Sequence, residues 1–370
     1  MPQTPHSADD LECLCSSANV SSSDLEQALG QTDASLSAAR ANGLLVLLCR
    51  NESAGEDVLD VLLREYPEVA THRDEDGRYP LHVLCANKGI TVRALRALLN
   101  AHSEAASARS YDQDYPLHVL AGNESMTSEM LAILMKVNPE AAGAQGRGGV
   151  HPLHALCANA HVSTATLLEV LDAPPPAASQ LGEYPAYRGL PLHSLASNPS
   201  ATPEMLVALL AANPAAACEA DDYGDYALTY VCKRAPRAHL AELVRELARA
   251  CPEAAAHEDE DGAYAVHVLC ANPGVNGDAL EALLEAYPKS ATVRDGSGRK
   301  AFAVLAANPA LNDMQPEDVV SMLSALFAAH PEALVHADRS GKAAEQLLPA
   351  KLAGALHAAV ESVPVRSVAT

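Results

Sequence analysis

One nine-residue motif returns along this chain at a nearly constant interval. Its clearest copy reads YPLHVLCAN and spans residues 79–87. The last residues of successive copies are 36 positions apart, except for one step of 39 and one of 38. A fixed period of this length is typical of repeat proteins, in which each period folds as one supersecondary unit. The other copies, some of them degenerate, span 43–51, 115–123, 151–159, 190–198, 226–234, 264–272 and 300–308.

Each period predicts two short helices joined by turns. Pro80 suits the first turn of a helix, where its missing N–H costs nothing, and Asn87 is expected to end that helix as a left-handed C-cap. The second helix should begin near a Ser or Thr and run to a proline that often opens a PEAA-like string, as at 139–142. An Asp- and Gly-rich turn, as at 74–77, completes the period.

Helices this short are not stable alone, so each unit must bury its leucines against its neighbours. The predicted fold class is therefore all-α, a helical-repeat solenoid of stacked helix-turn-helix units with projecting loops. We expect residues 1–40 to form a weak N-terminal capping repeat and residues 41–348 an array of about eight units. Residues 349–370 should form a C-terminal cap and tail.

Composition narrows the classes of partner. Asp and Glu total 47 against 25 Lys and Arg, a formal net charge of −22, which excludes a phosphate-rich nucleic acid partner. No apolar run near the start approaches the ~20 residues of a membrane helix, and the first residues lack a secretory signal pattern, so we expect a cytoplasmic protein, with the nucleus left open. Nine cysteines, most of them at one repeat position, do not resemble a disulfide framework.

The spacing Asp74-x-x-Gly77-x-x-Pro80-Leu81-His82 resembles the ankyrin repeat, whose hallmark is a D-x-x-G turn before T-P-L-H. The resemblance covers roughly residues 40–348 and implies a divergent ankyrin array of the kind seen in algal and protist proteins. The chain departs from the family in its period, 36 instead of 33, and in Tyr79, which replaces the usual Thr. A different helix-pair solenoid is the alternative fold.

Recurring histidines and cysteines are the only periodic residues that suggest chemistry. A metal- or thiol-based function would use this ladder, but stacked helices lie ~8–10 Å apart and zinc needs four ligands at one centre. We therefore expect buried, structural residues, and a backbone role for the recurring asparagines. No catalytic residue, metal ligand or cofactor is assigned. The recurring histidines and cysteines are His82, His118, His154, His193, His267, Cys49, Cys85, Cys157, Cys232 and Cys270.

The array leaves no room for a separate catalytic domain, so the predicted function is a non-catalytic protein–protein interaction scaffold. The ankyrin resemblance implies contacts through loop tips and the concave helix face. The acidic loops suggest a basic segment of another protein as partner, although charge that only maintains solubility is an equal alternative. The candidate partner-binding residues are Glu75, Asp76, Arg78, Asp112, Gln113, Arg147, Tyr184, Tyr187, Arg188, Tyr223, Asp225, Asp259, Glu260 and Arg299.

Overall fold

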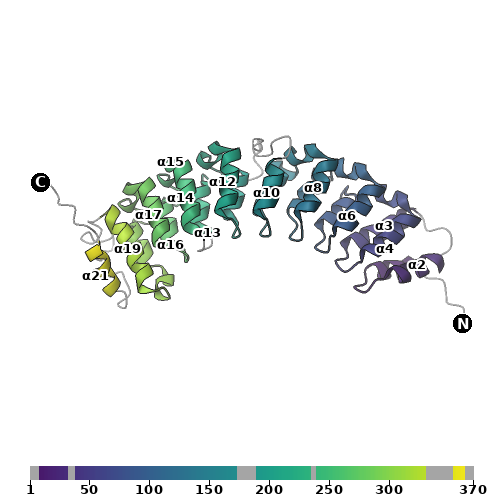
Figure 1. Ribbon diagram of the computed structural model, residues 1–370, viewed down its shortest axis with the longest axis horizontal. Coiled ribbons are helices and arrows are strands. Elements are labelled where there is room, and N and C mark those ends of the chain that lie inside the picture. Colours follow the sequence, from purple (N-terminus) through teal and green to yellow (C-terminus); the bar gives the residue numbers. More distant parts are fainter. Residues whose placement is uncertain (1–7, 32–37, 173–188, 235–238, 331–352, 363–370) are drawn as a thin grey trace. The chain divides into compact units, whose positions relative to one another are not determined.

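The computed structural model of the chain describes residues 8–31, 38–172, 189–234, 239–330 and 353–362 (Figure 1). These residues form α-helices and 3-10 helices, with two isolated bridges that join Glu258 to Tyr264 and Arg294 to Lys300. The predicted all-α class is confirmed. The chain divides into two compact units, Met1–Tyr187 (unit 1) and Arg188–Thr370 (unit 2). None of the helices in the described segments has the length and apolar character needed to cross a membrane.

One repeat of unit 1 illustrates how the sequence sets each element. Helix α5 (Pro80–Ala86) begins at its proline, and helix α6 (Val92–Ala101) begins after Thr91, whose hydroxyl accepts the N–H of Ala94 at 3.1 Å. The expected pair of helices is thus present. A 3-10 turn, η2 (Ser103–Ser107), follows α6 and was not predicted.

Unit 1 stacks five helix pairs. Each first helix contacts the first helix of the next pair, and each second helix contacts the next second helix. The first helices are α1 (Ala8–Cys15), α3 (Ala38–Arg50), α5, α7 (Pro116–Ala121) and α9 (Pro152–Ala158). The second helices are α2 (Ser22–Gln31), α4 (Glu56–Glu65), α6, α8 (Ser128–Val137) and α10 (Thr164–Leu171). The 3-10 turns are η1 (Pro67–Thr71), η2, η3 (Pro139–Gly143) and η4 (Arg147–Gly149).

Unit 2 stacks four helix pairs in the same way, and α21 (Ala353–Ser362) packs against the last second helix. The first helices are α11 (Pro191–Ser197), α13 (Ala227–Arg234), α16 (Ala265–Ala271) and α18 (Ala301–Ala306). The second helices are α12 (Pro203–Ala212), α14 (Leu240–Ala250), α17 (Gly277–Ala286) and α19 (Pro316–Ala329). Short helical turns follow four of these helices. They are η5 (Pro214–Cys218) after α12, α15 (Pro252–Ala255) after α14, η6 (Pro288–Ala291) after α17 and η7 (Pro309–Asn312) after α18.

The core of both units is mainly aliphatic. In the α5–α6 repeat, Leu81, Leu84, Leu95 and Leu98 are all buried. Burying such side chains is worth roughly 1.5–3 kcal/mol each, which offsets the poor stability of isolated short helices. The leucine face of each repeat is therefore what holds it to its neighbours.

The recurring asparagines connect successive repeats. Asn123 Nδ2 donates to the carbonyl oxygens of Cys85 and Asn87 in the preceding repeat, each at 2.8 Å, and its Oδ1 accepts the N–H of Ser125. We call this arrangement the asparagine link. The predicted left-handed C-cap is wrong, because Asn87 has φ −79° and ψ 130°. The role is one of backbone hydrogen bonding, but it reaches across repeats. Donation to the preceding repeat recurs at Asn51, Asn87, Asn159, Asn272 and Asn308.

The recurring histidines form a second connection, the histidine link. His82 Nδ1 accepts the N–H of Tyr79 at 3.2 Å, and its Nε2 lies 3.2 Å from the carbonyl oxygen of Asp114 in the next repeat. Burial lowers the pKa of His82 to about 4, so the ring is neutral and Nε2 donates to that carbonyl. His118 repeats the arrangement with Tyr115 and Ala144. These nitrogens face backbone groups, so a metal ladder is not supported.

The recurring cysteines are buried thiols. Desolvation raises the pKa of Cys49, Cys85, Cys157, Cys232 and Cys270 far above its ordinary value, so these thiols are poor nucleophiles. Cys15 belongs to the same column, because Asn51 donates to its carbonyl oxygen. Sequence comparison missed Cys15 because its repeat lacks the PLH motif.

Candidate interaction surface

A five-residue loop precedes the first helix in most repeats, and we call it the finger loop. In the loop 74–78, the N–H of Asp74 donates to the carbonyl oxygen of Arg78 at 2.9 Å, and the N–H of Gly77 donates to that of Asp74 at 3.0 Å. Gly77 has φ +71°, a conformation that favours glycine. The same backbone bonds close the loops 110–114, 146–150, 221–225, 259–263 and 295–299.

An aspartate at the first loop position holds the turn. Asp74 Oδ1 accepts the N–H groups of Asp76 and Arg78 at 3.0 and 2.9 Å. Burial disfavours its charge, but hydrogen bonds from Arg78 outweigh that effect and lower the pKa of Asp74. The D-x-x-G pattern therefore predicted the turn for a sound physical reason. Equivalent bonds form at Asp221, Asp259 and Asp295.

The loop 146–150 replaces that aspartate with glycine and takes its acceptor from the preceding loop. Asp114 Oδ1 accepts the N–H of Arg147 at 2.9 Å. A Cβ at Gly146 would overlap this carboxylate and the ring of His118. One loop thus supports the next, which no single-repeat pattern could predict.

The structure places most of the predicted partner-binding residues on the finger loops. The exposed ones are Glu75, Asp76, Asp112, Gln113, Arg147, Glu260 and Arg299, and the half-buried ones are Arg78, Tyr223, Asp225 and Asp259. Tyr184, Tyr187 and Arg188 lie outside the described residues.

Four of the predicted residues are basic, and the three that the structure describes are already paired. Arg78 contacts Asp74 and Asp76 at 2.9 and 2.6 Å, and Arg147 contacts Asp112 at 3.4 Å. Arg299 contacts Asp295 at 2.8 Å. The basic finger residues therefore serve first to balance acidic neighbours.

The finger loops of unit 2 concentrate negative charge. The loops 221–225 and 259–263 each contain three carboxylates and no basic residue. Burial raises the pKa of Asp225, and the carboxylates of Asp221, Asp259 and Glu260 raise it further, against an opposing effect of Lys233. The two loops therefore act on a common region of negative potential.

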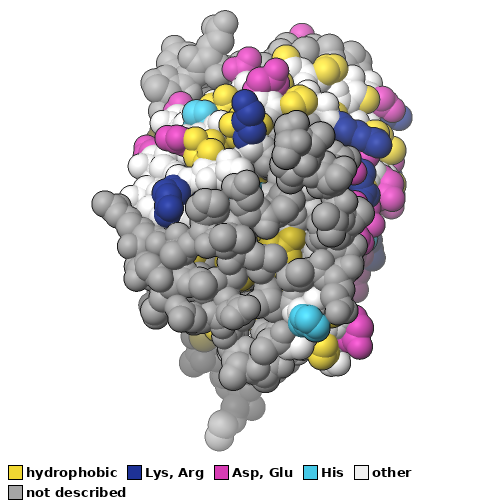
Figure 2. Space-filling model, turned by 90° about the vertical axis from the view of Figure 1, so that its left-hand side faces the viewer, with side chains coloured by type: hydrophobic (Ala, Val, Ile, Leu, Met, Phe, Trp, Pro, Cys, Tyr) yellow, Lys and Arg dark blue, Asp and Glu magenta, His cyan; other side chains and the backbone are white. Residues whose placement is uncertain are grey.

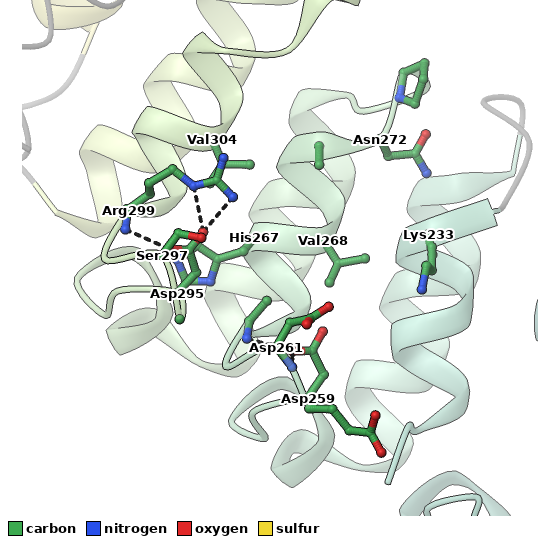
Figure 3. Close-up of a pocket in the computed structure, with 15 residues that line it drawn as sticks. Lys233, Asp259, Asp261, His267, Val268, Asn272, Asp295, Ser297, Arg299 and Val304 are labelled. Atoms are coloured by element: carbon green, nitrogen blue, oxygen red, sulfur yellow. Dashed lines mark hydrogen bonds and ion pairs between the residues drawn. The ribbon is translucent and has the colours of Figure 1, made fainter. Parts of the chain in front are cut away.

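A hollow of about 610 Å³ in unit 2 is lined in part by residues of the loops 259–263 and 295–299. Figure 3 shows Asp259 and Asp261 at one side, Lys233 on α13 at another, and Arg299 bound to Asp295 across from it. Among the described residues, Glu260 and Asp261 of the hollow form no ion pair. The remaining lining includes the polar side chains of His267 and Asn272 and the apolar side chains of Val268, Ala271 and Val304.

The end of unit 2 that carries α21 has a different character. Figure 2 shows this end, where the acidic, basic and apolar side chains that are described lie interspersed. The finger loops 221–225 and 259–263 differ from this mixture, because all of their charged side chains are acidic.

Outside the finger loops, one cluster of possible metal ligands occurs among the described residues, formed by Cys218, Cys251 and Glu253. The two cysteines form a disulfide, which the sequence did not indicate because neither lies in the recurring column. Their thiol groups are thereby unavailable as ligands in this state.

The chain is similar to solved structures, although not to any family model or curated protein. The crystal structure of the human ASB11 ankyrin repeat domain is 16% identical over 65% of this chain and 96% of that chain, with a TM-score of 0.48. The chain is built of ankyrin-like repeats, on the strength of its own D-x-x-G turns, P-L-H helices and histidine links.

Proposed function

We propose that the protein is an interaction scaffold whose finger loops 221–225 and 259–263 bind a basic segment of another protein. The observation that carries this proposal is that these two loops each hold three carboxylates and no basic residue. Folding these loops brings like charges together at a cost, and an approaching Lys or Arg would relieve it. The hollow beside the loop 259–263 offers space for such a side chain.

Electrostatics sets the expected strength. One charge pair at 4 Å is worth ~1 kcal/mol in water and ~4 kcal/mol near a protein surface. Exposed charges are screened over ~8 Å at physiological salt. Several carboxylates acting together should therefore give binding that is fast, modest in affinity and sensitive to salt.

The test uses the full chain and a fluorescent peptide of alternating Lys and Gly, with binding followed by anisotropy at several salt concentrations. The variant Glu260→Gln/Asp261→Asn removes two charges from the hollow. The control Glu281→Gln/Glu285→Gln removes two exposed charges from α17 in the same unit. We expect the first variant to weaken binding roughly tenfold and the control to change it less than twofold, since each surface pair is worth up to ~1 kcal/mol.

Equal losses in both variants would show that only net charge matters and would reject the finger-loop site. Binding that does not weaken between low and high salt would reject the electrostatic mechanism. A matched Glu–Gly peptide should not bind either protein.

A further inference from the structure

One joint between repeats in unit 2 lacks both recurring links. By joint we mean the interface between two successive repeats, and this one lies between the α11 repeat and the α13 repeat. Arg234 occupies the position of the linking asparagine and is exposed. His193 Nδ1 accepts the N–H of Leu190, but its buried Nε2 has no hydrogen-bond partner among the described residues. This joint therefore lacks the asparagine link that each of the other two joints of unit 2 keeps.

A disulfide crosses this same joint. Cys218 ends η5 of the first repeat, and Cys251 caps α14 of the second, with Cα atoms 5.3 Å apart. At the corresponding place in unit 1, Asn138 Nδ2 donates to the carbonyl oxygen of Ala106 at 3.1 Å. The disulfide thus occupies the position in the repeat at which a joint of unit 1 has a hydrogen bond. It occurs at the joint that lacks both the asparagine link and the histidine link.

The two sulfur atoms differ in accessibility. Cys218 is exposed, whereas Cys251 is fully buried. Apart from these two, the other cysteines are free thiols, and all but Cys13 are buried. An external thiol can therefore reach this disulfide through Cys218.

We propose that Cys218 and Cys251 form a redox-controlled clamp that closes the joint when oxidised and loosens it when reduced by a dithiol. Since stability in a repeat array depends on the interfaces between neighbours, breaking this bond lowers the cost of separating the two repeats. The effect is local to unit 2.

The exchange balances as a two-electron reduction. A thiolate of the dithiol attacks Sγ of Cys218, forms a mixed disulfide and releases the thiolate of Cys251, which takes up a proton. The second thiolate of the reductant then attacks the reductant's own sulfur in the mixed disulfide and releases Cys218 as a thiolate, which takes up a proton. The reductant leaves as a cyclic disulfide. A disulfide-class oxidant reverses the sequence.

Glu253 is placed to set the rate of this exchange. Its Oε2 lies 3.5 Å from Sγ of Cys251. A negative carboxylate disfavours the thiolate that must leave, so Cys251 is a slow leaving group. Glu253 is a positioning residue for the clamp, and Glu253→Gln should accelerate reduction without changing the fold.

The first measurement counts thiols in the full chain. Protein purified without reductant should yield seven alkylated cysteines after denaturation, and nine after reduction with dithiothreitol. Nine thiols at every ratio of oxidised to reduced glutathione would overturn the proposal. So would one equivalent of bound zinc with nine thiols, because Cys218, Cys251 and Glu253 would then be metal ligands.

The second measurement follows hydrogen exchange in α13 and α14. The two cysteines are separated by 33 residues, for which loop-closure entropy predicts a roughly 500-fold larger opening constant after reduction. Cys218→Ser should exchange like the reduced protein and should not respond to dithiothreitol, while Cys13→Ser should behave like the parent. Unchanged exchange on reduction would reject the clamp, and an unchanged reduction rate in Glu253→Gln would reject the role of Glu253.

Discussion

Replacing Asn123 by Ala would remove one complete asparagine link from unit 1. The side chain is 7% exposed, and its amide makes three hydrogen bonds, all at 2.8 Å. Two of them reach the preceding repeat, and the third fixes the turn after α7. The change therefore weakens both a joint and a turn, while it leaves the leucine core unaltered.

The expected loss of unfolding free energy is about 3 kcal/mol, since each buried hydrogen bond contributes ~1 kcal/mol net. Asn123→Asp is a more specific test of the asparagine link, because it keeps the shape of the side chain and the oxygen that accepts the N–H of Ser125. Its carboxylate, however, would face the carbonyl oxygens of Cys85 and Asn87. At neutral pH the Asp variant should be at least as destabilised as the Ala variant.

The chain contains no tryptophan, so urea unfolding is best followed by circular dichroism. Asn100→Ala is the matched control, because Asn100 is exposed near the end of α6 and its loss should change stability by less than ~0.5 kcal/mol. If Asn123→Ala lies within that range of the parent protein, the link is not a stabilising contact and the reasoning fails.

Two further predictions concern unit 1. Burial lowers the pKa of His82 and His118 to about 4, whereas the same side chains in the unfolded state take up protons near pH 6.5. The unfolding free energy should therefore fall as the pH falls from about 6.5 to 4, by roughly 2 kcal/mol per histidine at pH 5. Urea unfolding midpoints that coincide at pH 7 and pH 5 would contradict this prediction. Gln113 has φ +69° at the position where the other finger loops have glycine. Gln113→Gly should therefore raise the unfolding free energy by ~0.5–1 kcal/mol, measured by the same urea titration. The control Glu75→Gly should lower the unfolding free energy.

The sequence predicted the features that a single repeat determines. Pro80 and Thr91 mark where helices begin, and Asp74 with Gly77 marks the finger turn, because each acts on its own backbone neighbours. The all-α class followed from the same local signals. The positions of the charged finger residues on one set of loops also followed from their phase in the repeat.

Contacts between repeats were harder to predict. Asn123 acts on Cys85 and Asn87, 38 and 36 residues earlier, so its role was assigned to the wrong local motif. Asp114 likewise acts outside its own repeat, because its side chain accepts the N–H of Arg147 in the next finger loop. The disulfide of Cys218 and Cys251 lies outside the motif altogether, and only the stacked geometry brings the pair together.

Departures from the repeat concentrate in the α13 repeat, and this has a physical consequence. Near α13, Thr229 replaces the linking histidine, Arg234 replaces the linking asparagine, and Tyr230 donates its hydroxyl to Asp221 at 2.7 Å. Stability in an array is a sum over units and interfaces, so the joint with fewest shared links opens at least cost. The acidic loops 221–225 and 259–263 flank this same helix. A change of redox state at the disulfide would therefore act on the part of unit 2 that carries the proposed binding charges, and peptide binding should weaken on reduction in the parent but not in Cys218→Ser.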